Sequence, residues 1–197
     1  MNNFEKLKKQ MDFLIEVDKV KNIYRQNYIT DGSRRENDAE HSWHLAMMAF
    51  ILSDYTKEAD LDVLKVMKMV LIHDIVEIDA GDTFLYDEQG YLDKDERETK
   101  AAMRIFGILP EDQKNEMIDL WEEFELRETK EAKFAAALDG IHPLMNNYIT
   151  KGAGWKNHDV KAEKVLEKKA YIEEISPELW EYAKKIIEEC ANLGYLK

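Results

Sequence analysis

The stretch VLIHDIVEIDAGD, residues 70–82, combines a strongly apolar run with one histidine and several carboxylates. Its aliphatic side chains have the spacing of core residues in a helix, yet His73, Asp74 and Glu77 stand among them. Burying an ionised carboxylate without a partner costs several kcal/mol, so such a group is normally paired, protonated or bound to a metal. At about 100° per residue, His73 and Glu77 share one helical face and Asp74 lies next to it. The segment therefore predicts half of a divalent-cation site on a buried helix.

The rest of the chain is also helical in pattern. Apolar residues recur at three- to four-residue steps, which predicts helices over residues 3–20, 40–55, 61–79, 93–106, 111–126, 130–150, 159–174 and 177–192. We expect the first of these helices to pack through Phe4, Leu7, Met11, Leu14, Ile15 and Val17. No segment shows the alternation and hairpin turns of a convincing strand. The sequence thus predicts an all-α fold, a single helical bundle over residues 1–197.

Composition and charge narrow the class of protein. The chain has 197 residues, enough for one domain with a substantial core. Its formal net charge of -13 repels nucleic-acid backbones and anionic membranes, so we expect neither as a partner. The single Cys190 cannot form a disulfide within the chain, and no apolar run approaches the roughly 18 residues of a membrane span. These features predict a cytoplasmic protein without a secretion signal.

Two further residues are candidate metal ligands. His41 lies in the first turn of the second predicted helix. Asp139 lies in the apolar run KFAAALDGIHPLM, residues 133–145, and has no charged partner close in sequence, so the argument made for Asp74 applies to it as well.

The other polar residues near these positions have simpler explanations. We interpret His44 as a hydrogen-bonded core histidine, which is the commoner role of a lone histidine on an apolar helix. His142 precedes Pro143, and we interpret it as a residue near a bend. The segment 22–38 carries arginines at 25, 34 and 35, which are either an anion clamp or solvated loop charges.

The joint pattern is more specific than its parts. His41, then His73-Asp74, then Asp139 reproduces the H…HD…D signature, and by it the chain resembles the HD-domain phosphohydrolases. Glu40-His41-Ser42 and the segment from His73 to Glu77, followed by Gly81-Asp82, are similar to the subgroup that includes 5'-deoxynucleotidases acting on nucleoside monophosphates. The resemblance covers roughly residues 5–190 and implies an HD-domain helical bundle that forms a homodimer.

This resemblance implies one divalent metal held by His41, His73, Asp74 and Asp139. Nitrogen and carboxylate ligands suit Mn, Co, Fe, Zn or Ni, and the sequence does not choose among them. The implied reaction is hydrolysis of a (deoxy)nucleoside 5'-monophosphate to nucleoside and phosphate.

Further site residues follow from the same resemblance. Arg25 corresponds to a phosphate-contacting arginine. Glu77 would orient or deprotonate the attacking water, and Asp82 would place the substrate or protonate the leaving oxygen, although these two roles are exchangeable. In the subgroup a tryptophan follows the arginine, whereas here the next residue is Gln26. Selectivity for deoxyribose therefore does not carry over.

Three alternatives remain open at this point. The histidines and aspartates could satisfy one another in a core that binds no metal. The metal site could belong to a nucleotide-binding module without turnover, against which the extra acid Glu77 argues. The same ligand pattern also serves cyclic-nucleotide phosphodiesterases and hydrolases of (p)ppGpp or dNTPs.

Overall fold

The structure, a computed structural model, describes residues 1–156 and 158–197 and confirms the all-helical class. Helices of the 3-10 type are labelled η. In chain order the elements are α1 (Asn3–Val17), η1 (Asp18–Asn22), β1 (Tyr24–Tyr28), β2 (Arg35–Asn37), α2 (Asp38–Leu52), η2 (Ser53–Tyr55), α3 (Val63–Ile72), η3 (His73–Val76), α4 (Glu77–Ala80), α5 (Lys94–Phe106), α6 (Glu111–Leu126), α7 (Lys130–Ile149), α8 (Ala162–Lys169), α9 (Ile172–Ile175) and α10 (Pro177–Asn192).

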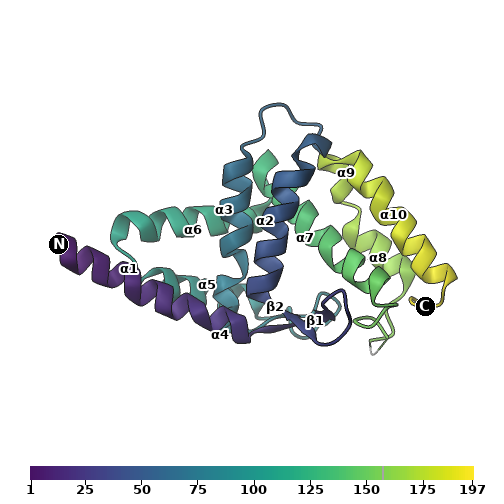
Figure 1. Cartoon of the computed structure of the whole chain (residues 1–197), viewed down its shortest axis with the longest axis horizontal. Coiled ribbons are helices and arrows are strands. Elements are labelled where there is room, and N and C mark those ends of the chain that lie inside the picture. The colour runs from purple at the N-terminus through teal and green to yellow at the C-terminus, as the bar shows by residue number, and fades with distance from the viewer. Residues whose placement is uncertain (157) are drawn as a thin grey trace.

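The centre of the molecule is formed by α2, α3 and α7. A loop at the top of Figure 1 connects α2 to α3, so these two helices run side by side in opposite directions, and α7 packs against both. Helices α5 and α6 cover one flank of this centre, and α8, α9 and α10 cover the other (Figure 1). The side chains at the centre are almost fully buried, among them Leu45, Ala49, Val66, Met69, Leu138 and Ile141.

The long helix expected over residues 61–79 is broken in the middle. Helix α3 ends at Ile72, the backbone tightens into η3 over His73–Val76, and the short α4 begins at Glu77. At three residues per turn instead of 3.6, His73 and Glu77 no longer stand one helical turn apart, but both side chains still line the same cavity. Gly81 then takes a φ of +76°, a conformation that favours glycine, and turns the chain so that Asp82 lines a cavity.

The expectation that the chain has no strand is wrong for a short segment. Strands β1 and β2 form an antiparallel pair, with Tyr24 opposite Asn37 and Tyr28 opposite Arg35. All of β1 is exposed or half-buried, so it lacks the alternation of apolar and polar residues by which strands are recognised. The pairing places Arg25 beside the start of α2, where Asn37 caps the helix by accepting a hydrogen bond from the Glu40 amide.

The expectation that residues 3–20 pack against the rest of the chain through one apolar face is also wrong for a single chain. In α1 only Phe13 is buried. Five of the six residues expected to form its packing face are largely exposed, namely Phe4, Leu7, Met11, Leu14 and Ile15. The helix forms as predicted, but most of its apolar face has no cover from the described part of the chain.

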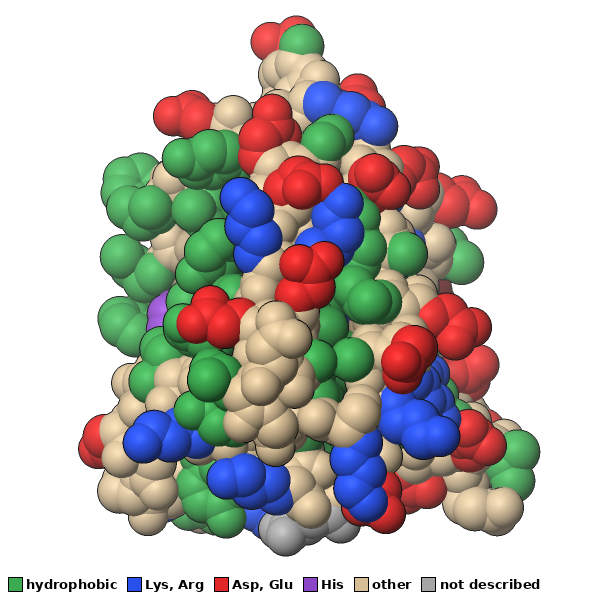
Figure 2. Space-filling model, turned by 90° about the vertical axis from the view of Figure 1, so that its right-hand side faces the viewer, with side chains coloured by type: hydrophobic (Ala, Val, Ile, Leu, Met, Phe, Trp, Pro, Cys, Tyr) green, Lys and Arg blue, Asp and Glu red, His purple; other side chains and the backbone are tan. Residues whose placement is uncertain are grey.

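The surface is mixed in charge. Figure 2 shows acidic and basic side chains interspersed over the flank formed by α8, α9 and α10. Within the described residues, no helix combines the length and apolar character needed to cross a membrane.

Candidate metal centre

Three elements bring the four predicted ligand residues together. His41 comes from α2, His73 and Asp74 from η3, and Asp139 from α7. The Nε2 atom of His41 lies 3.0 Å from Asp139 Oδ1 and 3.9 Å from Asp74 Oδ2. The Nε2 atom of His73 lies 3.2 Å from Asp74 Oδ1 and 4.0 Å from Asp139 Oδ1. Residues far apart in the sequence thus direct two imidazole nitrogens and two carboxylates at one region.

The hydrogen bonding of His73 shows that this region fits a cation. Its Nδ1 lies 2.9 Å from the carbonyl oxygen of Val70, which can only accept, so Nδ1 carries the proton. In the neutral ring, Nε2 then presents a lone pair. This atom is buried and has no hydrogen-bond partner among the described residues, although Asp74 Oδ1 is close. A lone pair held against a carboxylate is unfavourable unless a cation lies between them.

Arg25 supplies positive charge to the same carboxylates. Its Nη1 donates to Asp74 Oδ2 at 2.6 Å and to Asp38 Oδ1 at 3.3 Å, and its Nη2 lies 3.8 Å from Asp139 Oδ1. Burial by itself would lower the pKa of Arg25, but the surrounding carboxylates, Asp74 foremost, raise it above its ordinary value. The guanidinium therefore stays charged beside the predicted metal ligands.

Additional acids surround this arginine. Asp38, Asp74 and Glu77 place carboxylate oxygens within 4.8 Å of one another. Burial, and then the negative charge of Asp74, raises the pKa of Asp38 to about 8 and that of Glu77 well above its ordinary value. Burial also raises the pKa of Asp82. Such a group of acids is suited to holding or moving protons near neutral pH.

These residues line a cavity of about 260 Å³, near the lower end of the range for small-molecule sites. Its wall includes the predicted residues Arg25, His73, Asp74, Glu77, Asp82 and Asp139. Aromatic side chains form another part of the wall, namely Phe84, Tyr86, Tyr91, Phe124, Trp155 and Tyr171. The cavity therefore combines charged groups with flat apolar surfaces.

Lys169, the last residue of α8, is the least expected residue of this wall. It is buried, and among the described residues no carboxylate forms an ion pair with its ammonium group. Burial lowers its pKa from 10.5 to about 8, and Asp139 is the carboxylate whose charge most opposes this effect. Lys94, by contrast, pairs with Glu98 at 2.8 Å. A buried cation without a counter-ion is costly, and such groups are common at binding sites.

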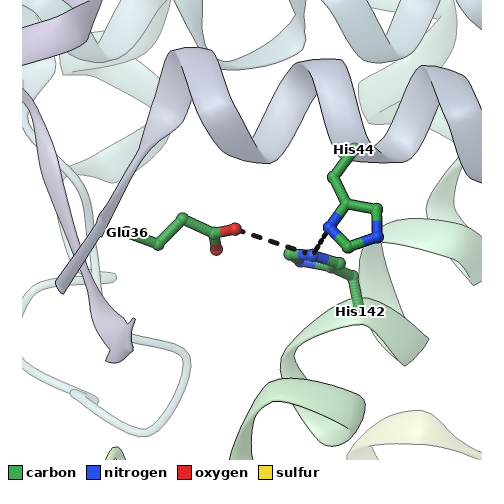
Figure 3. Close-up of side chains that lie close together, drawn as sticks. All are labelled: Glu36, His44 and His142. Atoms are coloured by element: carbon green, nitrogen blue, oxygen red, sulfur yellow. Dashed lines mark hydrogen bonds and ion pairs between the residues drawn. The ribbon is translucent and has the colours of Figure 1, made fainter. Parts of the chain in front are cut away.

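A second cluster lies behind His41. The Nδ1 atom of His41 is 3.0 Å from Nδ1 of His142, whose Nε2 is 2.9 Å from His44 Nδ1 and 3.6 Å from Glu36 Oε1. Figure 3 shows the side chains of Glu36 and His44 approaching the same edge of His142. The interpretation of His142 as a residue near a bend did not predict these contacts. Helix α7 continues through Pro143, so His142 lies within the helix.

Several residues of the site were not singled out from the sequence. The position of Asp38 could have been predicted, because the Asn37-x-x-Glu40 pattern of a helix N-terminus places it in the first turn of α2. Glu36 belongs to a polar segment that resembles a solvated loop. Lys169 carried no signal, since it follows Lys168 in a helix rich in lysine and glutamate.

Comparison with known proteins supports a metal-dependent phosphohydrolase. A protein from Magnetospirillum magnetotacticum, described as a "predicted metal-dependent phosphohydrolase", has a crystal structure that matches with a TM-score of 0.93 at 53% identity, covering 98% of this chain and 96% of that one. A conserved hypothetical protein from Pyrococcus furiosus matches with a TM-score of 0.65 at 28% identity, covering 92% of this chain and 99% of that one.

Curated relatives are similar over a shorter segment. The human 5'-deoxynucleotidase HDDC2 is 32% identical over 136 residues, which are 68% of this chain and 65% of the human protein. The bovine 5'-deoxynucleotidase HDDC2 is 31% identical over 136 residues, 68% of this chain and 64% of the relative. The match thus spans somewhat less than two thirds of each relative.

The family assignment rests on a match over most of the chain. Residues 17–180 match a family model described as "HD domain". This range contains every one of the four predicted ligand residues and both short strands. The predicted resemblance is therefore confirmed, and the chain belongs to the HD-domain family.

Proposed function

We propose that this protein is a metal-dependent phosphomonoesterase that hydrolyses ribo- or deoxyribonucleoside 5'-monophosphates to a nucleoside and inorganic phosphate. The observation that supports the proposal is the cavity, in which His73, three aspartates, an arginine and further acids lie beside aromatic side chains. The relatives named 5'-deoxynucleotidase support this substrate class.

Four residues would hold one divalent metal, namely His41, His73, Asp74 and Asp139. Mn, Co, Fe, Zn and Ni all suit this mixture of nitrogen and carboxylate donors. When bound, the metal supplies a Lewis acid that offsets phosphate charge and lowers the pKa of water. The histidines must be neutral to act as ligands. Burial lowers the pKa of His41 well below its ordinary value, which keeps this ring neutral at physiological pH.

Arg25 would bind the substrate phosphate. Its Nη1 is engaged by Asp74 and Asp38, but its Nη2 lies 3.8 Å from Asp139 Oδ1 and donates no hydrogen bond among the described residues. Part of the planar donor fork is therefore free to contact phosphate oxygens, which guanidinium groups match in geometry. Gln26, the next residue, also lines the cavity and takes the place of the tryptophan of the deoxynucleotidase subgroup.

Glu77 and Asp82 would handle the protons of the reaction. We assign Glu77 to orienting or deprotonating the attacking water, and Asp82 to placing the substrate or protonating the leaving oxygen. Both carboxyl groups line the cavity and burial raises the pKa of each, as is common for acid–base groups in enzyme sites.

The remaining wall suits the other parts of a nucleotide. The ammonium group of Lys169 would find its counter-ion in the substrate phosphate, because no carboxylate of the described chain forms an ion pair with it. Aromatic side chains such as Tyr91, Trp155 and Tyr171 offer surfaces on which a base or sugar can pack.

We also propose that the protein is a homodimer. On α2, the side chains of Trp43, Phe50 and Ile51 are each 63% exposed. Ile51 also lines an apolar groove that continues over Met145 and Tyr182. Figure 2 shows hydrophobic side chains gathered along its left edge, which is the front of Figure 1 where α2 lies. Large exposed apolar patches are uncommon on monomers, and a second copy of the chain would cover this one.

Phosphate release from a substrate panel tests the proposed reaction. Protein stripped with EDTA would be reloaded with Mn, Co, Zn or Ni and incubated with ribo- and deoxyribonucleoside 5'-monophosphates, with cyclic nucleotides and dNTPs as comparators. We expect one phosphate per monophosphate, and only in the presence of metal. Turnover confined to the comparators would contradict the substrate class. Tight nucleotide binding without any product would identify a binding module instead.

A further inference from the structure

The contact between His41 and His142 joins two identical atoms. Their Nδ1 nitrogens lie 3.0 Å apart, and both rings are buried. Two N–H groups or two lone pairs facing each other at this distance would repel, and complete burial disfavours a charged ring, so each ring is a neutral imidazole with a single N–H. Only one of the two nitrogens can be the donor in this contact. The position of the proton on one ring therefore determines its position on the other.

The two possible arrangements differ in what they leave for the metal. If His41 donates from Nδ1, its Nε2 presents a lone pair towards Asp139 and the region of His73 Nε2, as a ligand must. If His142 donates instead, the proton of His41 moves to Nε2 and is donated to Asp139 Oδ1 at 3.0 Å, an arrangement that suits the site only while no cation lies there. That nitrogen can then bind no metal.

The far edge of His142 favours the first arrangement. Its Nε2 lies 2.9 Å from Nδ1 of His44 and 3.6 Å from Oε1 of Glu36 (Figure 3). A lone pair on His142 Nε2 would face a carboxyl oxygen of Glu36, whereas an N–H there is attracted by that oxygen and can donate to His44. With the proton on Nε2, His142 Nδ1 must accept from His41.

We propose that His142, held by His44 and Glu36, is a positioning residue that fixes the tautomer of His41 and keeps its Nε2 free to bind the metal. This inference rests on the metal centre of the proposed function but not on the identity of the substrate. His73 needs no such device, because the carbonyl oxygen of Val70 fixes its tautomer directly. Groups behind a ligand that orient it in this way commonly change metal affinity by 10–100-fold when they are removed.

The cluster could in principle hold a metal of its own. Glu36, His44 and His142 offer ligand atoms within 4.8 Å of one another. A metal on His142 Nε2, however, would move the proton of that ring to Nδ1, which would force His41 to carry its proton on Nε2. The two sites are therefore mutually exclusive through the shared hydrogen bond. Since the ligand set around His41 is the larger, we assign the proton, not a metal, to His142 Nε2.

Two substitutions of His142 separate the tautomer role from packing. The side-chain oxygen of asparagine can take the place of Nδ1 and accept from His41, whereas glutamine reaches past that position but is closer to histidine in size. Titration of the metal-free protein with Co(II), followed by its visible absorption, gives the dissociation constant. We expect His142→Gln to weaken Co(II) binding by about 10–100-fold and His142→Asn to stay within a few-fold of wild type. The opposite ranking would show a packing role and overturn the proposal.

Two further measurements need no substrate. Nitrogen-15 correlation spectra of histidine-labelled protein loaded with diamagnetic Zn(II) should show the proton of His142 on Nε2 and that of His41 on Nδ1, and a proton on His142 Nδ1 would overturn the proposal. Wild-type protein should bind one Co(II) per chain. Two equivalents in wild type and one in His44→Ala would show that the cluster is a metal site. A failure to release phosphate from any nucleotide would leave these results unchanged and would contradict only the proposed reaction.

Discussion

Arg25 Nη1 donates a 2.6 Å hydrogen bond to Asp74 Oδ2, which links the residue proposed to bind phosphate directly to a residue proposed to bind the metal. The same guanidinium contacts Asp38 and faces Asp139. It thus compensates the carboxylates when no other cation is near. If metal and phosphate bound together, the carboxylates would pair with the metal and the guanidinium with the phosphate.

Replacing Arg25 should therefore destabilise the metal-free protein more than the metal-loaded one. Arg25→Met leaves buried carboxylates without their cation, a change that typically costs about 3–5 kcal/mol. Urea unfolding in EDTA and in saturating Mn measures the difference, which we expect to shrink when Mn compensates the same groups. Arg34→Met is the control, because Arg34 pairs with Glu40 at the exposed surface and its replacement should change the free energy of unfolding far less than that of Arg25. Equal losses with and without Mn would contradict this account.

Glu77→Gln should remove activity while leaving the metal in place. The substitution keeps the shape of the side chain but cannot take up a proton, and general acid–base groups contribute about 10²–10⁴-fold to the rate. The measurements are kcat on the best nucleoside monophosphate and metal content by elemental analysis. Full turnover of this variant would remove Glu77 from the mechanism. A loss of metal would instead make it a ligand.

Lys169→Met should weaken the binding of phosphate compounds. Lys169 lines the cavity without an ion-pair partner in the described chain, whereas the adjacent Lys168 lines the same cavity but lies over the ring of Tyr91. Loss of a charge-assisted contact worth about 1.5–3 kcal/mol corresponds to roughly a 10- to 100-fold higher KM. Lys168→Met is the matched control and should change KM by no more than a few-fold. Calorimetry with inorganic phosphate checks the same ranking without turnover, and equal effects of the two variants would refute a special role for Lys169.

The sequence could predict the ligand residues because each breaks an apolar pattern. His73, Asp74 and Asp139 stand in segments whose neighbours are buried, so their polarity needs a partner that the local sequence does not provide. Asp38 and Glu36 are equally buried but lie among polar residues, where nothing distinguishes them from solvated side chains. Their burial depends on the pairing of β1 with β2 and on the position of α7, which local patterns do not contain.

The sequence pattern also failed to predict features for which two different structures give the same spacing of residues. A turn of three residues and a turn of 3.6 residues are not distinguishable over the four residues of η3, so the break at His73 could not be foreseen. The spacing of Phe4, Leu7 and Leu14 correctly predicts a helix but says nothing of what covers its apolar face. That information belongs to the tertiary or quaternary structure.

The burial of Lys169 should also appear in the pH dependence of stability. Its pKa is about 8 in the folded protein and has the ordinary lysine value of 10.5 in the unfolded chain. Between these two pH values the unfolded chain therefore binds more protons. Stability contributed by this residue therefore rises with pH between about 8 and 10.5, and the charged lysine costs roughly 3 kcal/mol below that window. We expect Lys169→Met to be more stable than wild type at pH 7 and to lose this advantage by pH 10, as measured by urea unfolding. A less stable variant at pH 7 would mean that the ammonium has a partner.

The exposed face of α2 should determine the oligomeric state. Phe50 is 63% exposed in one chain, so a lysine at this position should not disturb the fold, whereas in a dimer interface it would bury a charge. We expect Phe50→Lys to raise the dimer dissociation constant roughly 30-fold or more, which corresponds to the 2 kcal/mol of an interface hot spot. Sedimentation equilibrium measures this constant, and circular dichroism checks that the helices persist. Leu92→Lys, at an exposed apolar residue outside the groove, should leave the constant unchanged. A wild-type protein that is monomeric at all concentrations would exclude this interface.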